Sequence, residues 1–190
     1  MKVRESDIPA EAIWEGFFEP SEVLGTLGID GTVVDVAEFG CGYGTFTIPA
    51  ATLISGNIDA IDIEPEMINT VNDCAQGRGL TNIVLMLRDF IADGSGLADV
   101  SVDYVILFNI LHDERPERML NESYRILRPK GRLGIIHWNY DSSTPRGPPM
   151  DIRPKPEQCY EWALKAGFTC VSSHDLKPYH YGFVFAKPQA

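Results

Sequence analysis

The chain has few cysteines and contains no long apolar run. Its four cysteines, Cys41, Cys74, Cys159 and Cys170, form no C-x-x-C pair, so we expect neither a disulfide framework nor a bound metal. No apolar stretch approaches the roughly 20 residues that span a bilayer. Residues 1–9 lack the apolar segment of a signal peptide, so we expect a cytoplasmic protein with no membrane partner.

Basic residues are scarce as well: 16 stand against 27 acidic ones, for a formal net charge of −11. This charge repels a phosphate backbone unless basic groups gather on one face. The only basic concentration, between Arg115 and Arg132, is interleaved with acids and is typical of a solvated helix face. We therefore expect no nucleic-acid partner. A chain of 190 residues, 44% of them hydrophobic, indicates a single globular domain over residues 1–190.

Five short apolar runs rich in β-branched residues predict strands that are buried on both faces. They span residues 32–39, 57–63, 83–87, 102–108 and 132–138. Helical patterns lie between them at residues 46–55, 65–77 and 116–127. This alternation predicts a parallel sheet with crossover helices. Later in the chain, a helix at 156–166 precedes two runs, 168–172 and 181–186, that alternate like an antiparallel pair.

Three further segments have a distinct character. Residues 1–30 are interpreted as a helical cap, in which 10–27 packs over the carboxyl edge of the sheet. Arg-Pro-Lys-Gly at 128–131 is predicted to stop a helix in a turn. Residues 139–156 contain five prolines and cannot form a regular helix or a central strand. Because long irregular segments are commonly functional, we expect a substrate-side loop there.

The most informative motif is an apolar run that leads into an acid and a glycine-rich turn. It ends in Glu38 and then in three alternate glycines, Gly40, Gly42 and Gly44. Glycine adopts backbone angles closed to other residues and lets a ligand approach the main chain. The dinucleotide pattern G-x-G-x-x-G requires glycine or alanine where Thr45 or Thr47 stands, so the spacing disfavours a nicotinamide cofactor.

Polar residues follow the other predicted parallel strands, whose carboxyl ends meet at one edge of the sheet. Asp62 is suited to accept both ribose hydroxyls of a nucleoside, and Asp89 to accept an adenine amino hydrogen while Phe90 covers the ring. Either aspartate also has a plain alternative as a helix or turn cap. Asp103 is expected to support the glycine turn without touching a ligand, and the fourth strand ends in Asn109.

These motifs together resemble the class I S-adenosylmethionine-dependent methyltransferases, in the small-molecule branch similar to ubiquinone and menaquinone methyltransferases. Glu38 to Gly44, E-x-G-x-G-x-G, resembles motif I of that family. The other segments that carry the resemblance are residues 60–67, 88–90, 101–112 and 125–131. The resemblance implies an α/β, Rossmann-like three-layer sandwich. Its seven-stranded sheet would be mostly parallel, with an antiparallel C-terminal hairpin.

The resemblance also implies the cofactor, S-adenosyl-L-methionine, and a small-molecule acceptor methylated by in-line displacement. The residues expected to bind the cofactor are Glu38, Phe39, Gly40, Cys41, Gly42, Gly44, Asp62, Ile63, Met67, Asp89, Phe90, Asn109, Ile110 and Leu111. His112, an imidazole at the carboxyl edge of the sheet, is suited to take a proton from the acceptor as a catalytic base. A structural histidine is its alternative.

Aromatic and imidazole residues form a second group, suited to line the acceptor pocket. They are Trp14, His137, Trp138, Asn139, Tyr140, Tyr179 and Tyr181. Trp138 and Tyr181 also suit a role as core aromatics with a satisfied polar tip.

Three other functions stay open: a nicotinamide-dependent oxidoreductase, a non-catalytic S-adenosylmethionine-binding module, and a methyltransferase with a protein or RNA acceptor. The fourth strand lacks the Asn/Asp-Pro-Pro-Tyr segment of nucleobase amino methylases. The identity of the acceptor and the oligomeric state are open.

Overall fold

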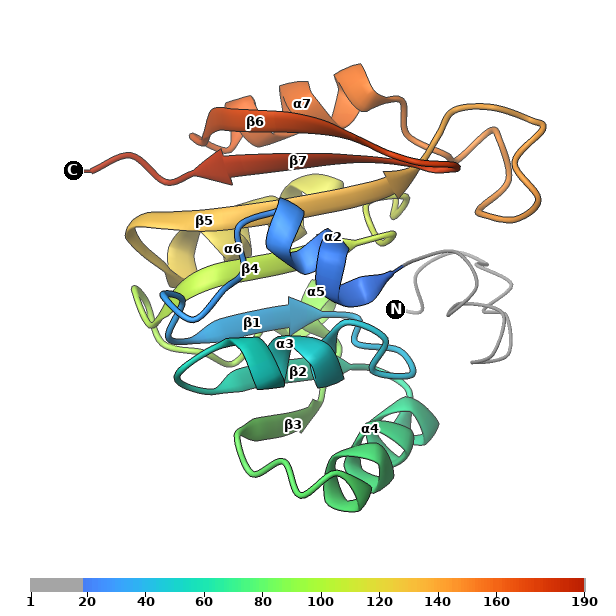
Figure 1. Ribbon diagram of the computed structural model, residues 1–190. Helices are drawn as coiled ribbons and strands as arrows, with labels where there is room; N and C mark the ends of the chain where they lie inside the picture. Colours follow the sequence, from blue (N-terminus) through green and yellow to red (C-terminus); the bar gives the residue numbers. More distant parts are fainter. Residues whose placement is uncertain (1–18, 190) are drawn as a thin grey trace.

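The computed structural model describes residues 19–189, and its centre is one sheet with strand order β3-β2-β1-β4-β5-β7-β6 (Figure 1). Five neighbouring strands are parallel: β1 (Val36–Phe39), β2 (Ile58–Asp62), β3 (Ile83–Leu87), β4 (Val102–Phe108) and β5 (Leu127–Trp138). The last two, β6 (Thr169–Leu176) and β7 (His180–Ala186), form an antiparallel hairpin, and β7 is antiparallel to β5 as well. The predicted seven-stranded mixed sheet is confirmed.

Helices cover both faces of the sheet and complete three layers (Figure 1). One face carries α2 (Pro20–Thr26), α3 (Thr47–Leu53) and α4 (Pro65–Gly77). The other carries α5 (Phe90–Asp93), α6 (Pro116–Ile126) and α7 (Pro156–Lys165). Prolines at the starts of α4, α6 and α7 occupy first-turn positions, where the missing N–H has no intrahelical partner. Within residues 19–189, no helix has the length and apolarity needed to cross a membrane.

Sheet position decides how deeply each predicted strand is buried. All four residues of β1 are buried between the helical layers, as the apolar run predicts. The edge strand β3 differs, because Val84 and Leu87 are exposed. The expectation of burial on both faces is therefore wrong for β3, which among residues 19–189 has a neighbouring strand on one side only.

The junction between α6 and β5 differs from the predicted turn. Strand β5 begins at Leu127, directly after the helix, and its first residues continue alongside β4. The register shifts between Val102 and Tyr104, and Lys130 adopts a positive φ of 66°. A bulged start to the strand thus accommodates residues 128–131, which the sequence assigns to a turn before residue 132.

Helix α2 packs on a face of the sheet rather than over its carboxyl edge. Leu24 and Leu27 lie in one cluster with Ile106 and Val184 from the middle of the sheet, and Leu27 O accepts a hydrogen bond of 2.8 Å from the Tyr104 hydroxyl. The expectation that residues 10–27 pack over the carboxyl edge of the sheet is therefore wrong for α2. The remainder of the predicted N-terminal cap lies outside the described residues.

Asp103 lies at the amino end of β4, so its predicted support of the glycine turn is wrong. Its carboxylate accepts hydrogen bonds from Asp35 N at 2.9 Å and from Arg128 at 2.7 Å, and Arg128 also contacts the Asp35 carboxylate at 3.1 Å. At about 3.3 Å per residue, Asp103 is about 17 Å from the carboxyl end of its strand. The three side chains tie together the amino ends of β1, β4 and β5.

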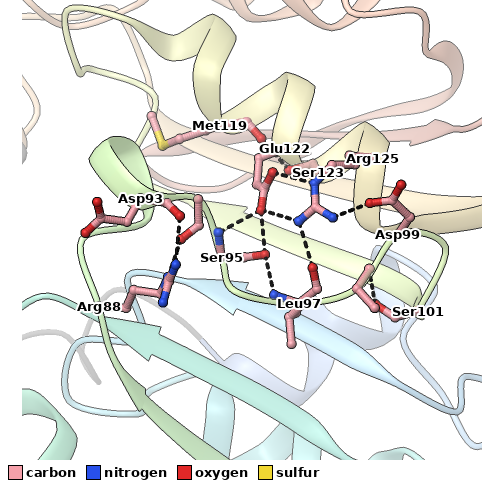
Figure 2. Close-up of polar contacts among 12 residues, drawn as sticks. Arg88, Asp93, Ser95, Leu97, Asp99, Ser101, Met119, Glu122, Ser123 and Arg125 are labelled. Atoms are coloured by element: carbon pink, nitrogen blue, oxygen red, sulfur yellow. Dashed lines mark hydrogen bonds and ion pairs between the residues drawn. The ribbon is translucent and has the colours of Figure 1, made fainter.

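A second polar cluster fixes the connection between α5 and β4 (Figure 2). Glu122 on α6 accepts hydrogen bonds from both Ser95 N and Ser95 Oγ, at 2.7 and 2.6 Å. Arg125 pairs with the same carboxylate and with Asp99, and its hydrogen bonds lower the pKa of Glu122 to about 2. Arg88 donates to Gly94 O at 2.6 Å. These contacts hold the segment that follows β3 against α6.

Candidate functional site

The carboxyl ends of β1 to β4 bring the predicted polar residues to one edge of the sheet. From β1 the chain builds outward through β2 to β3, and then crosses to β4 on the other side of β1. The reversal of strand order lies between β1 and β4, where open α/β sheets bind their ligands. The residues at these strand ends or within two positions after them are Glu38, Asp62, Asp89 and Asn109.

Three glycines of the turn after β1 adopt positive φ, for two different reasons. A Cβ on Gly40 would lie 2.5 Å from Ile110 Cδ1, and one on Gly44 would lie 3.1 Å from Val71 Cγ2. These two positions are closed by packing. A Cβ on Gly42, at φ +52°, would meet no atom of the described residues within 4 Å. Gly42 therefore presents bare backbone to open space.

Asp62 fixes the shape of this turn. Its Oδ2 accepts the Gly42 N–H at 2.9 Å, and its Oδ1 accepts the Glu64 N–H at 3.0 Å. Burial raises the pKa of the Asp62 carboxyl, while these backbone hydrogen bonds oppose the rise. Because each carboxylate oxygen can accept a further hydrogen bond, Asp62 retains acceptor capacity for a ligand hydroxyl.

Glu38 is buried at the end of β1, with 3% of its surface exposed. The Thr47 hydroxyl at the start of α3 donates to its Oε2 at 2.5 Å. Burial raises the pKa of Glu38 to about 8. Cys41 nearby is buried too, and burial raises the pKa of its thiol far above neutral, so this cysteine is not a thiolate nucleophile.

Asp89 caps α5, the alternative role that its residue type also allowed. Its Oδ1 accepts the N–H groups of Ile91 and Ala92 at 3.1 and 2.9 Å. Phe90 is buried and packs on Phe39, with ring centroids 5.1 Å apart. The other apolar residues predicted to bind cofactor are largely buried as well: Met67, Ile110 and Leu111, with Ile63 half-buried.

Asn109, directly after β4, combines two unusual features. Its φ is +55°, a left-handed conformation that asparagine tolerates better than most residues. Its Oδ1 is buried and has no hydrogen-bond partner among residues 19–189. An unsatisfied buried acceptor costs about 1 to 3 kcal/mol, and such groups in native proteins call for a specific explanation. Together with the open face of Gly42, Asn109 fits a polar ligand at this edge.

Two histidines meet beside Asn109. His112 Nδ1 lies 3.3 Å from His137 Nε2, and both side chains are buried. His137 Nδ1 is buried without a hydrogen-bond partner in the described part of the chain. Burial, and then neighbouring His112 and His180, lower the pKa of His137 well below its usual range, so this imidazole is neutral at pH 7. Burial lowers the pKa of His180 to about 3.

The predicted acceptor residues divide between the core and the surface. Trp138 and Tyr181 are buried, and the Tyr181 hydroxyl donates to Pro154 O at 3.1 Å, as a core aromatic with a satisfied tip would. Tyr140 is exposed, with Lys155 Nζ 5.0 Å from its ring centroid. Asn139 N donates to Tyr179 O at 2.8 Å. Trp14 lies outside the described residues.

Arg153 is the organising residue that sequence reasoning missed. Only 7% of its surface is exposed, and its guanidinium donates to the carbonyls of Asn139, Asp141 and Pro148 at 2.8 to 3.1 Å. Burial lowers the pKa of Arg153. The identity of a residue does not show where its backbone carbonyl lies. The sequence therefore shows only an arginine in a proline-rich segment. The loop surrounds a depression of about 340 Å³, lined by Ser142, Thr144, Pro145, Arg146, Gly147, Pro148, Pro149, Met150 and Arg153.

Comparison with known proteins places this chain in a family. The profile of the family described as "Methyltransferase domain" matches residues 36–131, half of the chain, and includes β1 to β4 and the glycine turn. The chain therefore belongs to this family, the class I S-adenosylmethionine-dependent methyltransferases.

Individual relatives agree with this assignment. A Schizosaccharomyces pombe protein described as an uncharacterized methyltransferase is 30% identical, over 61% of this chain and 42% of its own length. Demethylmenaquinone methyltransferase of Lactobacillus johnsonii is 29% identical, over 57% of this chain and 43% of its own. The chain thus spans less than half the length of these curated relatives. A solved S-adenosylmethionine-dependent methyltransferase from Aquifex aeolicus has the same fold, with a TM-score of 0.81, 23% identity and 90% coverage of both chains.

Proposed function

We propose that this protein transfers a methyl group from S-adenosyl-L-methionine to a small-molecule acceptor. The observation that carries the proposal is the pairing of an open backbone at Gly42 with a buried, unpartnered acceptor on Asn109, on either side of the reversal in strand order. Membership of the methyltransferase family supports the choice of cofactor.

The residues that would hold the cofactor follow the strand ends. The turn from Glu38 to Gly44 would face its methionine part, Asp62 would accept its ribose hydroxyls, and Asp89 would accept its adenine amino group through lone pairs left by the α5 cap. Phe39, Phe90 and Leu111 are core side chains, so any contact from them would come mainly from backbone. Asn109 offers an acceptor with no partner in residues 19–189.

The protein contributes alignment, exclusion of water and proton removal. When bound, the cofactor supplies an electrophilic methyl group on a sulfonium. The rigid strand ends would hold the reacting groups in line. The entropy cost of orienting them is then met on binding, which lowers the activation barrier. His112 would accept the proton of a weakly acidic acceptor, and its Nδ1 lies 3.3 Å from His137 Nε2.

The acceptor side would be formed by the loop that Arg153 organises and by the residues at the end of β5. This loop leaves the same edge of the sheet as the carboxyl end of β5 (Figure 1). A net charge of −11 favours a small molecule over a nucleic acid. The cytoplasmic location and the single-domain organisation stay predictions.

Calorimetry combined with a methyl-transfer assay tests the proposal. The protein should bind S-adenosylmethionine and its demethylated product, and it should move an isotopically labelled methyl group from the cofactor to a component of a metabolite extract. Absence of binding at millimolar ligand would contradict the proposal. Binding without transfer would favour the non-catalytic module, and binding of reduced nicotinamide cofactor instead would favour an oxidoreductase.

A further inference from the structure

Among residues 19–189, Glu38 is a buried carboxyl group without a cation beside it. It stands at the end of β1, its one hydrogen-bonding side chain is that of Thr47, and 3% of its surface is exposed. Within residues 19–189, the charged group that acts on it is Asp62, a second carboxyl group at the end of β2, and the neighbouring ionisable group is the buried, neutral thiol of Cys41. No lysine, arginine or histidine of the described chain offsets a negative charge on Glu38.

A carboxylate in such a place is unfavourable, because burial removes its hydration and no positive charge from residues 19–189 replaces it. The group keeps its proton instead: burial raises the pKa of Glu38 to about 8, the Thr47 hydrogen bond opposes the rise, and the Asp62 carboxylate adds to it. At pH 7 the free protein therefore holds Glu38 mainly as the neutral acid.

The position of Glu38 gives this proton a consequence. Glu38 begins the turn in which Gly42 presents open backbone, and Asp62 shapes that turn. S-adenosylmethionine carries a sulfonium charge that its demethylated product, a neutral thioether, lacks. A cation placed near a buried carboxylic acid favours its ionised form.

We propose that Glu38 makes the cofactor site sensitive to ligand charge: it carries a proton in the free protein and releases that proton when the sulfonium-bearing cofactor binds. The O–H bond of Glu38 breaks, the electron pair stays on the carboxylate, and the proton passes to solvent. The demethylated product keeps the ammonium and carboxylate groups of the methionine part but lacks the sulfonium charge, so it draws out less of this proton. This inference rests on the proposed function and adds to it a residue that distinguishes cofactor from product.

Calorimetry at pH 7 in two buffers of different ionisation enthalpy measures the proton release. Wild-type protein should release close to one more proton per bound cofactor than Glu38→Gln, a comparison that cancels any proton from the ligand's own amino group. Asp59→Asn, a matched change of a half-buried carboxyl on β2, should behave like wild type. Equal proton release by wild type and Glu38→Gln would overturn the proposal.

The pH dependence of affinity supplies a second measurement. Linkage predicts that wild-type affinity for the cofactor rises by about tenfold per pH unit below pH 8, as the required ionisation becomes easier. Affinity for the product should rise less, and Glu38→Gln should lose the difference between the two ligands. Parallel pH profiles for both ligands in wild type would contradict the charge discrimination.

A ligand-free titration separates this inference from the proposed function. Carboxyl-¹³C-labelled glutamate, with the Glu38 signal identified by its absence in Glu38→Gln, should show Glu38 neutral at pH 7 and titrating near pH 8. A titration below pH 5 would overturn the inference even if the cofactor binds. Failure of wild type to bind either ligand, with Glu38 titrating near pH 8, would count against the proposed function and leave the buried acid established.

Discussion

His112 and His137 share a hydrogen bond, with Nδ1 of the first 3.3 Å from Nε2 of the second. Since a neutral imidazole has one donor and one acceptor nitrogen, one ring must donate in this contact and the other accept. A lowered pKa keeps His137 neutral. If His112 donates through Nδ1, its Nε2 carries the basic lone pair, the tautomer that a proton acceptor requires.

His112→Gln should therefore retain cofactor binding and lose methyl transfer by about 100- to 10,000-fold, the range of general-base contributions. Single-turnover transfer with saturating cofactor measures the loss, and calorimetry verifies binding. His174→Gln is a matched control, because that histidine lies on β6 and bonds to Ser172. A His112→Gln enzyme with wild-type turnover would rule out the role of base.

Gly42→Ala tests the open face of the glycine turn. Gly79→Ala is its matched control: φ is +68°, a Cβ there also meets no atom of residues 19–189 within 4 Å, and the site follows α4. Both changes should destabilise the fold by about 1 kcal/mol, the cost of alanine in left-handed backbone. Only Gly42→Ala should weaken cofactor binding in calorimetry. Equal affinities in the two variants would place the ligand elsewhere.

Asp62→Asn should weaken both the turn and the cofactor site. An amide group has one acceptor oxygen, so it cannot receive the N–H groups of Gly42 and Glu64 at both of its ends. We expect cofactor affinity to fall by about 1 to 3 kcal/mol through lost charged hydrogen bonds. Calorimetry checks this, with Asp59→Asn as the control. Unchanged affinity would exclude the proposed ribose contact.

Arg153→Met should loosen the loop at residues 139–152. Methionine fills similar volume but leaves the carbonyls of Asn139, Asp141 and Pro148 without their donor. Hydrogen exchange across the loop should accelerate, and unfolding free energy should fall by about 1 to 3 kcal/mol.

Two further variants sharpen the test of the loop. Arg153→Lys should not restore protection, because an ammonium group lacks the planar fork that reaches several carbonyls. Arg146→Met, a change of an exposed arginine in the same loop, should exchange like wild type. Slow exchange in Arg153→Met would show that the prolines alone hold the loop.

Acid should destabilise the fold through His180. Its folded-state pKa is about 3, below the ordinary 6.5, so the unfolded chain takes up a proton between those values while the folded protein does not. The stabilising contribution is complete above pH 6.5 and is lost towards pH 3, by at most about 1.4 kcal/mol per pH unit. Urea unfolding at pH 7, 6 and 5 should show a smaller loss for His180→Gln than for wild type. Equal losses of unfolding free energy in the two proteins would contradict the assignment of this pH dependence to His180.

Sequence reasoning succeeded where local pattern and strand polarity decide the structure. The glycine turn, Asp62 and Asn109 were placed at one edge because each directly follows an apolar run, and parallel strands end on the same side. The same reasoning failed for the role of Asp103, whose carboxylate contacts Asp35 and Arg128, both distant in the sequence, at the amino ends of the strands.

Contacts between distant segments set the rest of the site. The distance between His112 and His137 depends on how β4 and β5 pair. The hydrogen bonds of Arg153 depend on the positions of backbone carbonyls, which residue types do not show. The capping of α5 by Asp89 was visible as an alternative, because aspartate serves both ligand binding and helix capping.

The insertion of β7 between β5 and β6 links the order of synthesis to the completion of the site. His137 and Trp138 pair in register with Tyr181 and His180, which the ribosome adds more than forty residues later. Until then, a nascent chain exposes the free edge of β5 and leaves these aromatic groups without cover. Strand β7, which follows β5 in the chain, thus covers both the edge of β5 and the histidine side of the candidate site.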